Sequence, residues 1–272
     1  MHIFKKWDKQ MEWLCEKKPA LPVDAVVFDF DGTISTLRCG WEEVMEPLMT
    51  ELLGEESIAL IREYIDDSTG LQTIFQMKWL AERMNLLQPA VEHDPWLYKA
   101  EYNRRLMISV RQRLQLALES EAKRTDYMIK GSRELLEMLA DRGVSIYIAS
   151  GTDDNDVNNE VAALGLTEFF TEIKGAPEGR VNCSKEAIIR ELIEHKGITG
   201  NVLAVVGDGK VEIAIGRENG ARTLGVASDE RVLSGVNPVK RARLLRAGAD
   251  AIVGDFLNKS ELAEFFFGET DI

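Results

Sequence analysis

Two acidic residues stand close together directly after an apolar segment near the start of the chain. Residues 25–33 read AVVFDFDGT, so Asp29 and Asp31 are separated by one residue and are followed by Gly32 and Thr33. Two carboxylates at this spacing repel each other unless a positive charge lies beside them. The arrangement costs stability when nothing is bound, and it therefore predicts a functional site.

Two later apolar segments end in residues with related chemistry. One runs into Ser150 and Gly151, and the other runs into Asp208, with Glu212 four residues further on. Lys185 begins the helical pattern that precedes the second of these segments. Ligands of open α/β sheets bind beyond the carboxyl ends of the strands, so we expect these side chains to meet the first pair of acids.

This set of residue types matches the needs of phosphoryl transfer through a covalent aspartyl phosphate. A carboxylate can attack phosphorus only if the repulsion between the anions is cancelled, which requires a divalent cation held by oxygen ligands. Asp29 and Asp208 can hold that cation. Ser150 and Lys185 can hold the phosphoryl group, together with backbone N–H groups that Gly32 and Gly151 would let approach closely.

The second acid of the first segment has a different expected role. Asp31 would project toward the same side as Asp29 if the strand continues through it. From there it could give a proton to the leaving oxygen and later take one from a water molecule. Glu212 has a rival interpretation, because a glutamate in the first turn of a helix is often solvated.

The elements that must position these residues follow a repeating pattern. Short segments rich in Val and Ile are typical of strands in a buried parallel sheet, and helical patterns lie between most of them. The strand candidates are residues 23–30, 144–149, 202–206, 222–227 and 250–253. Alternating strands and helices predict an α/β fold with a doubly wound, Rossmann-like parallel sheet.

A second region has a purely helical pattern. Residues 41 to about 120 carry apolar residues at helical spacing and no strand signal, which predicts an all-α cap domain inserted after the first strand. We expect a cap over residues 38–124, a core built from residues 23–37 and 125–272, and an N-terminal helical extension over residues 1–22. The basic run at residues 237–248 predicts a solvated helix face.

Composition limits the partners and the location of the protein. The chain has 272 residues and a net charge of −13, which argues against nucleic acid or an anionic membrane as its main partner. Its 3 cysteines are widely spaced and indicate free thiols in a reducing cytoplasm. The opening residues mix charges into every few positions and lack a signal sequence or a membrane span, so we expect a cytoplasmic protein.

The motifs also carry a family resemblance. VVFDFDGT, IASGT, the lysine of SKEAIIREL and VVGDG with its trailing acid resemble, in order, the four motifs of the haloacid dehalogenase superfamily. The resemblance covers residues 23 to about 268 and implies a phosphatase-type member with a helical cap between the first and second motifs. It implies that Asp29 is the nucleophile, that Asp31 is the acid and base, and that Mg²⁺ is bound by Asp29, Asp208 and the carbonyl oxygen of Asp31.

Two positions depart from the family pattern or have a competitor. The fourth motif commonly ends in Asp, whereas Glu212 is one methylene longer and would reach the metal directly or through water. Lys174, in FFTEIKGAPEG, competes with Lys185 for the role of the third-motif lysine. Lys185 begins a helix that leads into the fourth-motif strand and fits the pattern better.

The expected function is therefore a magnesium-dependent phosphatase acting on a small phosphorylated metabolite, such as a sugar phosphate or a phosphoglycolate-like compound. Asp31 argues against a dehalogenase, because the resemblance implies that dehalogenases of this superfamily lack the second aspartate. A phosphomutase and a phosphonate hydrolase remain open on the same scaffold. A non-catalytic protein that binds phosphate esters is the alternative from another class, and the retained Asp29 and Asp31 argue against it. The sequence leaves the oligomeric state open.

Overall fold

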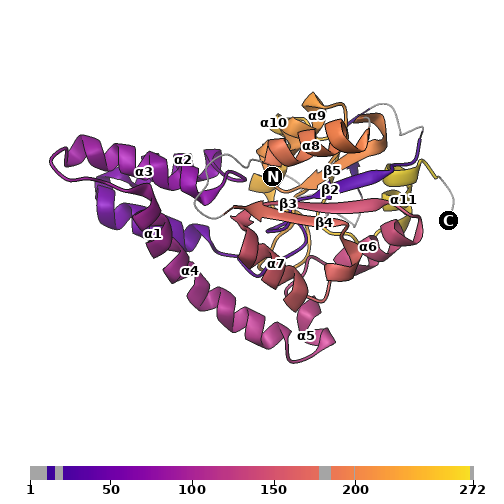
Figure 1. The fold of residues 1–272 in the computed structure, drawn as a ribbon, viewed down its shortest axis with the longest axis horizontal. Coiled ribbons are helices and arrows are strands. Elements are labelled where there is room, and N and C mark those ends of the chain that lie inside the picture. Colours follow the sequence, from indigo (N-terminus) through magenta and orange to yellow (C-terminus); the bar gives the residue numbers. More distant parts are fainter. Residues whose placement is uncertain (1–10, 16–20, 178–184, 199, 270–272) are drawn as a thin grey trace, which may run out of the picture.

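The computed structural model describes residues 11–15, 21–177, 185–198 and 200–269, and its centre is a seven-stranded sheet with helices on both faces (Figure 1). The strand order is β1-β7-β6-β5-β2-β3-β4, and all neighbours are parallel except β1 and β7. The strands are β1 Glu12–Trp13, β2 Ala25–Phe28, β3 Ser145–Asp153, β4 Glu172–Ala176, β5 Leu203–Gly207, β6 Arg222–Val226 and β7 Ala251–Val253. The predicted α/β fold is confirmed.

Each face of the sheet has its own apolar core because successive side chains of a strand point to opposite faces. In β2, Val26 and Phe28 pack into one buried cluster, whereas Ala25 and Val27 pack into another. The first cluster is completed by α6 Ser132–Asp141, α7 Asp154–Ala163 and α11 Lys259–Phe267. The opposite face is covered by α8 Lys185–Lys196, α9 Lys210–Glu218 and α10 Pro238–Ala247. Both faces are buried, which explains the continuous apolar runs of the central strands.

Strand β2 lies at the point where the chain direction across the sheet reverses. Its last residue, Phe28, is in register with Ile148 of β3 on one side and with Val206 of β5 on the other. The chain then continues outward to β4 on the first side and to β6 and β7 on the second. Residues that follow these positions emerge at one edge of the sheet, at the switch point where open α/β sheets bind ligands.

Four helices between β2 and β3 form a separate group beside the sheet, which we call the helical insertion (Figure 1). They are α1 Glu42–Leu53, α2 Ile58–Asp67, α3 Thr73–Leu87 and α4 Pro95–Ala117. Their apolar faces share one buried cluster that includes Met49, Ile61, Leu80 and Leu106. The short helix α5 Glu121–Thr125 then leads back to the sheet. In the part of the chain that the structure describes, short 3-10 helices occupy Glu55–Ser57, Thr167–Phe169 and Gly200–Val202.

Three local expectations differ from the structure. An N-terminal helix was expected over residues 1–22, but Glu12–Trp13 form a strand that pairs with β7, where Trp13 packs beside Phe265. Most other residues of this expected helix lie outside the described residues. The first core strand ends at Phe28 rather than at residue 30. Strand β4 was not expected, since EIKGA mixes charged and small residues at an edge of the sheet where only its last two residues are buried.

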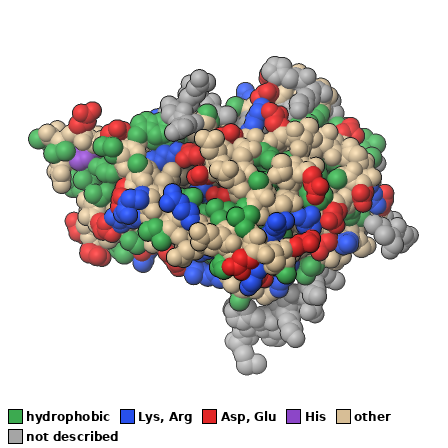
Figure 2. All heavy atoms as spheres, turned by 60° about the horizontal axis from the view of Figure 1, so that its bottom comes forward, with side chains coloured by type: hydrophobic (Ala, Val, Ile, Leu, Met, Phe, Trp, Pro, Cys, Tyr) green, Lys and Arg blue, Asp and Glu red, His purple; other side chains and the backbone are tan. Residues whose placement is uncertain are grey.

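The surface carries charged side chains of both signs. Acidic and basic side chains are mixed across the face shown in Figure 2. Among the helices that the structure describes, none has the length and apolarity needed to cross a bilayer. Within the described part of the chain, neither Cys15 nor Cys39 forms a disulfide bond, and Cys183 lies outside it.

Candidate active site

The residues that follow β2 and β5 meet a lysine from α8 in a buried cluster. The backbone N–H of Asp29 donates to the carbonyl oxygen of Val206 at 2.9 Å, which places its side chain, only 5% exposed, just beyond the strand end. The Lys185 Nζ donates to Asp29 Oδ1 at 2.7 Å and also to Glu212 Oε1. The ammonium group therefore joins two carboxylates from different elements.

The competing lysine lies elsewhere. Lys174 is in the edge strand β4, and its Nζ lies 2.8 Å from Glu191 and 3.2 Å from Glu172 in ion pairs on the surface. Lys185, in contrast, is buried next to Asp29. The geometry favours Lys185 for a role at the site.

Three carboxylates of this cluster form a candidate cation site. Oxygen atoms of Asp29, Asp208 and Glu212 all lie within 4.8 Å of one another. Glu212 is only 2% exposed, so it is not a solvated helix residue, and its Oε2 is buried without a hydrogen-bond partner among the described residues. Burial raises the pKa of Asp29, with the neighbouring acids adding to the rise and Lys185 opposing it. Closely spaced hard oxygen atoms that favour added positive charge fit a divalent cation such as Mg²⁺.

The second acid lies in the turn after the strand. Asp31 forms an isolated bridge with Ser35, and its Oδ2 accepts a hydrogen bond from Thr152 Oγ1 at 2.7 Å. Gly32 has a φ of 74°, and a Cβ at this position would lie 2.4 Å from Asp208 Oδ2. Only glycine tolerates both the backbone conformation and the close approach. The turn thus brings Asp31 beside the end of β3.

The expected phosphate-binding residues lie at that same end of β3. Ser150 is buried, and its Oγ accepts a hydrogen bond from the backbone N–H of Thr152 at 3.1 Å. Gly151 packs against the helical insertion, where a Cβ would lie 3.5 Å from the carbonyl oxygen of Leu71. The structure therefore brings the sequence-predicted residues Asp29, Asp31, Ser150, Gly151, Lys185, Asp208 and Glu212 to one edge of the sheet.

A cavity of about 100 Å³ opens between this edge and the helical insertion. Its core wall includes the two acids after β2, Ser150, Lys185 and Asp208. The insertion contributes Trp41, Thr69, Gly70, Leu71, Thr73, Gln76, Tyr102 and Leu106. Much of the wall made by the insertion carries hydroxyl, amide or aromatic groups, so the cavity suits a small polar molecule.

Ion pairs and a hydrogen bond hold the insertion against the core at two places. Asp66, at the end of α2, accepts from Arg243 of α10 at 2.9 Å, and the next residue, Asp67, accepts from Lys210 of α9 at 3.1 Å. At the second place, Asn103 of α4 donates to Asp153 of β3 at 3.1 Å. The structure therefore has the insertion in contact with the elements that carry the site.

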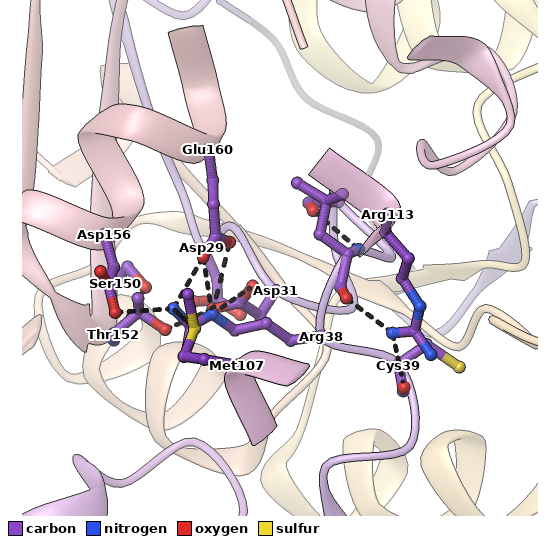
Figure 3. A network of polar contacts seen from close by, with 12 residues as sticks. Asp29, Asp31, Arg38, Cys39, Met107, Arg113, Ser150, Thr152, Asp156 and Glu160 are labelled. Carbon is purple, nitrogen blue, oxygen red and sulfur yellow. Dashed lines mark hydrogen bonds and ion pairs between the residues drawn. The ribbon is translucent and has the colours of Figure 1, made fainter. Parts of the chain in front are cut away.

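A buried arginine connects Asp31 to helix α7 (Figure 3). The Arg38 guanidinium lies 2.7 Å from Glu160 Oε1, 3.1 Å from Asp156 Oδ2 and 4.0 Å from Asp31 Oδ1. Burial raises the pKa of Glu160 to about 7, although the charge of Arg38 opposes the rise. Arg113 fixes the segment around Arg38 by donating to two of its backbone carbonyl oxygens, at 2.6 and 2.8 Å.

We expect Arg38→Met to lower the free energy of unfolding by about 3–5 kcal/mol at pH 8, because Glu160 would keep a buried charge without its partner. The folded-state pKa of Glu160 would then rise further above the usual 4.5. At pH 8 the buried charge penalises the variant, whereas near pH 5 Glu160 is protonated in both folded proteins and carries no charge, so the stability deficit should shrink as the pH falls toward 5. Urea unfolding at both pH values measures this, and Arg38→Met/Glu160→Gln is expected to recover part of the loss. A deficit that does not depend on pH would contradict this account.

Sequence reasoning missed several residues of the site. Arg38 and Trp41 line the cavity, whereas Arg104 and Arg105 pair with Glu101 on the outside of α4. Thr152 had a usable signal, since it follows the expected phosphate-binding serine in SGT.

The basic run over α10 is not a solvated face throughout. Lys240 and Arg243 are both buried, and the Lys240 Nζ lies 2.8 Å from Asp208 Oδ2. The sequence pattern does not reveal this contact, because it depends on how α10 packs on the sheet.

Comparison with known proteins agrees with the geometry. The model of the haloacid dehalogenase-like hydrolases matches residues 23–220. The chain therefore belongs to the haloacid dehalogenase-like hydrolase family and is a hydrolase enzyme. No curated protein matches the chain at a significant level.

Solved structures with the same fold include proteins of different named activities. A predicted phosphoglycolate phosphatase from Haemophilus somnus 129pt has 17% identity and a TM-score of 0.60, with 89% of this chain and 98% of that chain covered. A β-phosphoglucomutase from Clostridium difficile has 15% identity and a TM-score of 0.60, with 90% and 97% covered. At this identity the likeness establishes the fold, and the substrate has to be argued from the site.

Proposed function

We propose that this hydrolase is a magnesium-dependent phosphatase that acts on a small phosphorylated metabolite through an aspartyl-phosphate intermediate. The observation that carries the proposal is the contact of Lys185 Nζ with Asp29 Oδ1 at 2.7 Å, inside a buried group of carboxylates beside a cavity. A carboxylate paired with an ammonium group in this way can accept a phosphoryl group, because the ammonium group can also contact the phosphoryl oxygens and offset their negative charge.

In the first step, a carboxylate oxygen of Asp29 forms a bond to phosphorus while the bond between phosphorus and the leaving oxygen breaks. Asp31 gives its proton to that leaving oxygen, so the alcohol departs neutral. Thr152 holds Asp31 by donating to its Oδ2. Lys185 and Ser150 would hold the phosphoryl oxygens, together with the backbone N–H of Gly151.

In the second step, a water molecule attacks the phosphorus of the aspartyl phosphate. Asp31, now ionised, takes a proton from the water, and the bond between phosphorus and the Asp29 oxygen breaks. Inorganic phosphate leaves and the Asp29 carboxylate is restored. The leaving alcohol keeps the proton that Asp31 gave it, and Asp31 has recovered a proton from water, so each turnover starts from the same state.

Asp29, Asp208 and the carbonyl oxygen of Asp31 would hold Mg²⁺, with Glu212 binding directly or through water. When bound, the ion would supply the positive charge that cancels the repulsion between the attacking carboxylate and the phosphoryl oxygens. The raised pKa of Asp29 supports this role, because a nearby positive charge would stabilise the ionised carboxylate that burial disfavours.

We further propose that residues 38–124 act as a cap domain over a core made of residues 23–37 and 125–272. The insertion supplies Thr73, Gln76 and Tyr102 to the cavity wall, which is where the leaving alcohol would lie. Closure over the site would exclude bulk water from the first step. A cavity of about 100 Å³ favours a small metabolite over a macromolecule.

Release of phosphate from a panel of esters tests the proposal. The panel contains sugar phosphates, phosphoglycolate, nucleotides and an aryl phosphate, each with Mg²⁺ and with a chelator. We expect release that requires Mg²⁺ and is concentrated on one small ester. Release that persists in chelator would contradict the metal requirement. Isomerisation of a sugar phosphate without release would show a phosphomutase, and inertness toward the whole panel would contradict the phosphatase.

A further inference from the structure

A second lysine of the site comes from outside the part of the chain that the family model matches. Lys240 lies in the first turn of α10, whereas the match ends at residue 220. Its side chain is buried, and its Nζ lies 2.8 Å from Asp208 Oδ2 and 2.6 Å from Glu230 Oε1. Lys240 therefore contacts Asp208, whereas Lys185 contacts the other two carboxylates of the candidate cation site, Asp29 and Glu212.

The Lys240 ammonium is also in contact with the turn that carries Asp31. A Cβ on Gly32 would lie 3.0 Å from Lys240 Nζ. Ser228 Oγ lies 3.4 Å from the same Nζ and donates to the carbonyl oxygen of Gly32 at 2.9 Å. One ammonium group thus touches the turn after β2 and the carboxylate after β5.

Lys240 is held in place by a helix cap and by its acidic neighbours. Asn237 caps α10 by accepting from the backbone N–H groups of Val239 at 2.9 Å and Lys240 at 3.2 Å. The Nζ of Lys240 lies between two carboxylates, 2.8 Å from Asp208 Oδ2 and 2.6 Å from Glu230 Oε1, so both of these partners are acids. The residue is therefore a fixed cationic donor rather than a mobile surface lysine.

We infer that Lys240 is a positioning residue: by occupying Oδ2 of Asp208, it fixes the orientation of this carboxylate and leaves Oδ1 for the cation. The inference rests on the magnesium site of the proposed function. Groups that hydrogen-bond to a metal ligand orient it, and their loss typically lowers metal affinity about 10–100-fold. Lys240 would act through Asp208 and would not touch the substrate.

Binding of Mg²⁺ to the full chain, measured by isothermal titration calorimetry without substrate, tests this role. We expect Lys240→Met to weaken Mg²⁺ binding by about 10–100-fold, because Asp208 would lose the partner that orients it. Arg241→Met is the matched control: it removes the same charge from the next residue of α10, but Arg241 Nη2 pairs with Glu12 of β1. We expect its Mg²⁺ affinity to match that of the unchanged protein.

The opposite sign is the result that overturns the inference. If Lys240 only neutralised Asp208, its removal would leave a more negative site and would tighten Mg²⁺ binding. Unchanged affinity would overturn the inference as well. If the unchanged protein bound no Mg²⁺, the proposed metal site itself would fail, which is a distinct result.

A second variant covers the case in which Lys240→Met does not fold, as judged by circular dichroism. Lys240→Gln keeps an N–H donor toward Asp208 but carries no charge. If Lys240→Gln binds Mg²⁺ more weakly than the unchanged protein, by up to about 100-fold, the result supports positioning. If it binds Mg²⁺ more tightly than the unchanged protein, the result contradicts positioning.

Discussion

Asp29→Asn is expected to reduce turnover of the best ester by at least about 10⁴-fold, since an amide cannot form the phosphorylated intermediate. The fold should persist. The buried Asp29 carboxyl already has a raised pKa, so removing its charge relieves a cost of burial, and Lys185 keeps Glu212 as a partner. Initial rates and a thermal melt of the same preparation measure the two effects separately.

A control for this substitution exists on the same strand. Asp24 is exposed and lies just before β2, at the opposite end of the strand from Asp29. Asp24→Asn makes the same chemical change away from the site and should leave the rate unaltered. A folded Asp29→Asn protein that retains its rate would remove Asp29 from the role of nucleophile.

Asp31→Asn is expected to slow turnover by about 10²–10⁴-fold, with a dependence on the leaving group. An alkyl ester needs a proton on its leaving oxygen, so its first step should be slow. An aryl ester with an acidic phenol leaves without that proton, so its first step should stay fast while the attack of water is slow. Asparagine can still accept the hydrogen bond from Thr152, which keeps the side chain in place.

Rapid-mixing kinetics with the aryl ester separate the two steps. We expect a burst of about one phenolate per active site, followed by slow turnover as the phosphorylated enzyme accumulates. The alkyl ester should give no burst. Equal first-turnover losses for both esters would show that Asp31 is not the acid.

Much of the fold and the centre of the site could be predicted because both have short-range signals. The central strands are buried on both faces, so their sequences are continuous apolar runs. Asp29 and Asp208 follow such runs closely. Strand β1 left no signal, because two residues cannot display an alternating pattern. Strand β4 carries Glu172 and Lys174 at a sheet edge, where burial does not exclude charge.

The remaining parts of the site depend on contacts between distant segments. Arg38 resembled any arginine near a helix, and its role became visible only through its contact with Glu160 on α7. Lys240 belonged to a helix rich in basic residues, of which the packing of α10 buries only some. The burial of Glu212 likewise follows from α8, whose Lys185 lies against it. Such contacts have no pattern within a window of sequence.

The central position of β2 in the sheet has a consequence for how the chain acquires activity. Both neighbours of this strand, β3 and β5, come after the whole helical insertion in the chain, so its pairings have a high contact order and are expected to form late in folding. The insertion packs mainly local helices and can form first. At synthesis rates of about 5–20 residues per second, β2 waits on the order of ten seconds or more for β5 to be made. During that time its apolar residues remain open to chaperones or to aggregation, and the nascent chain has no complete catalytic centre.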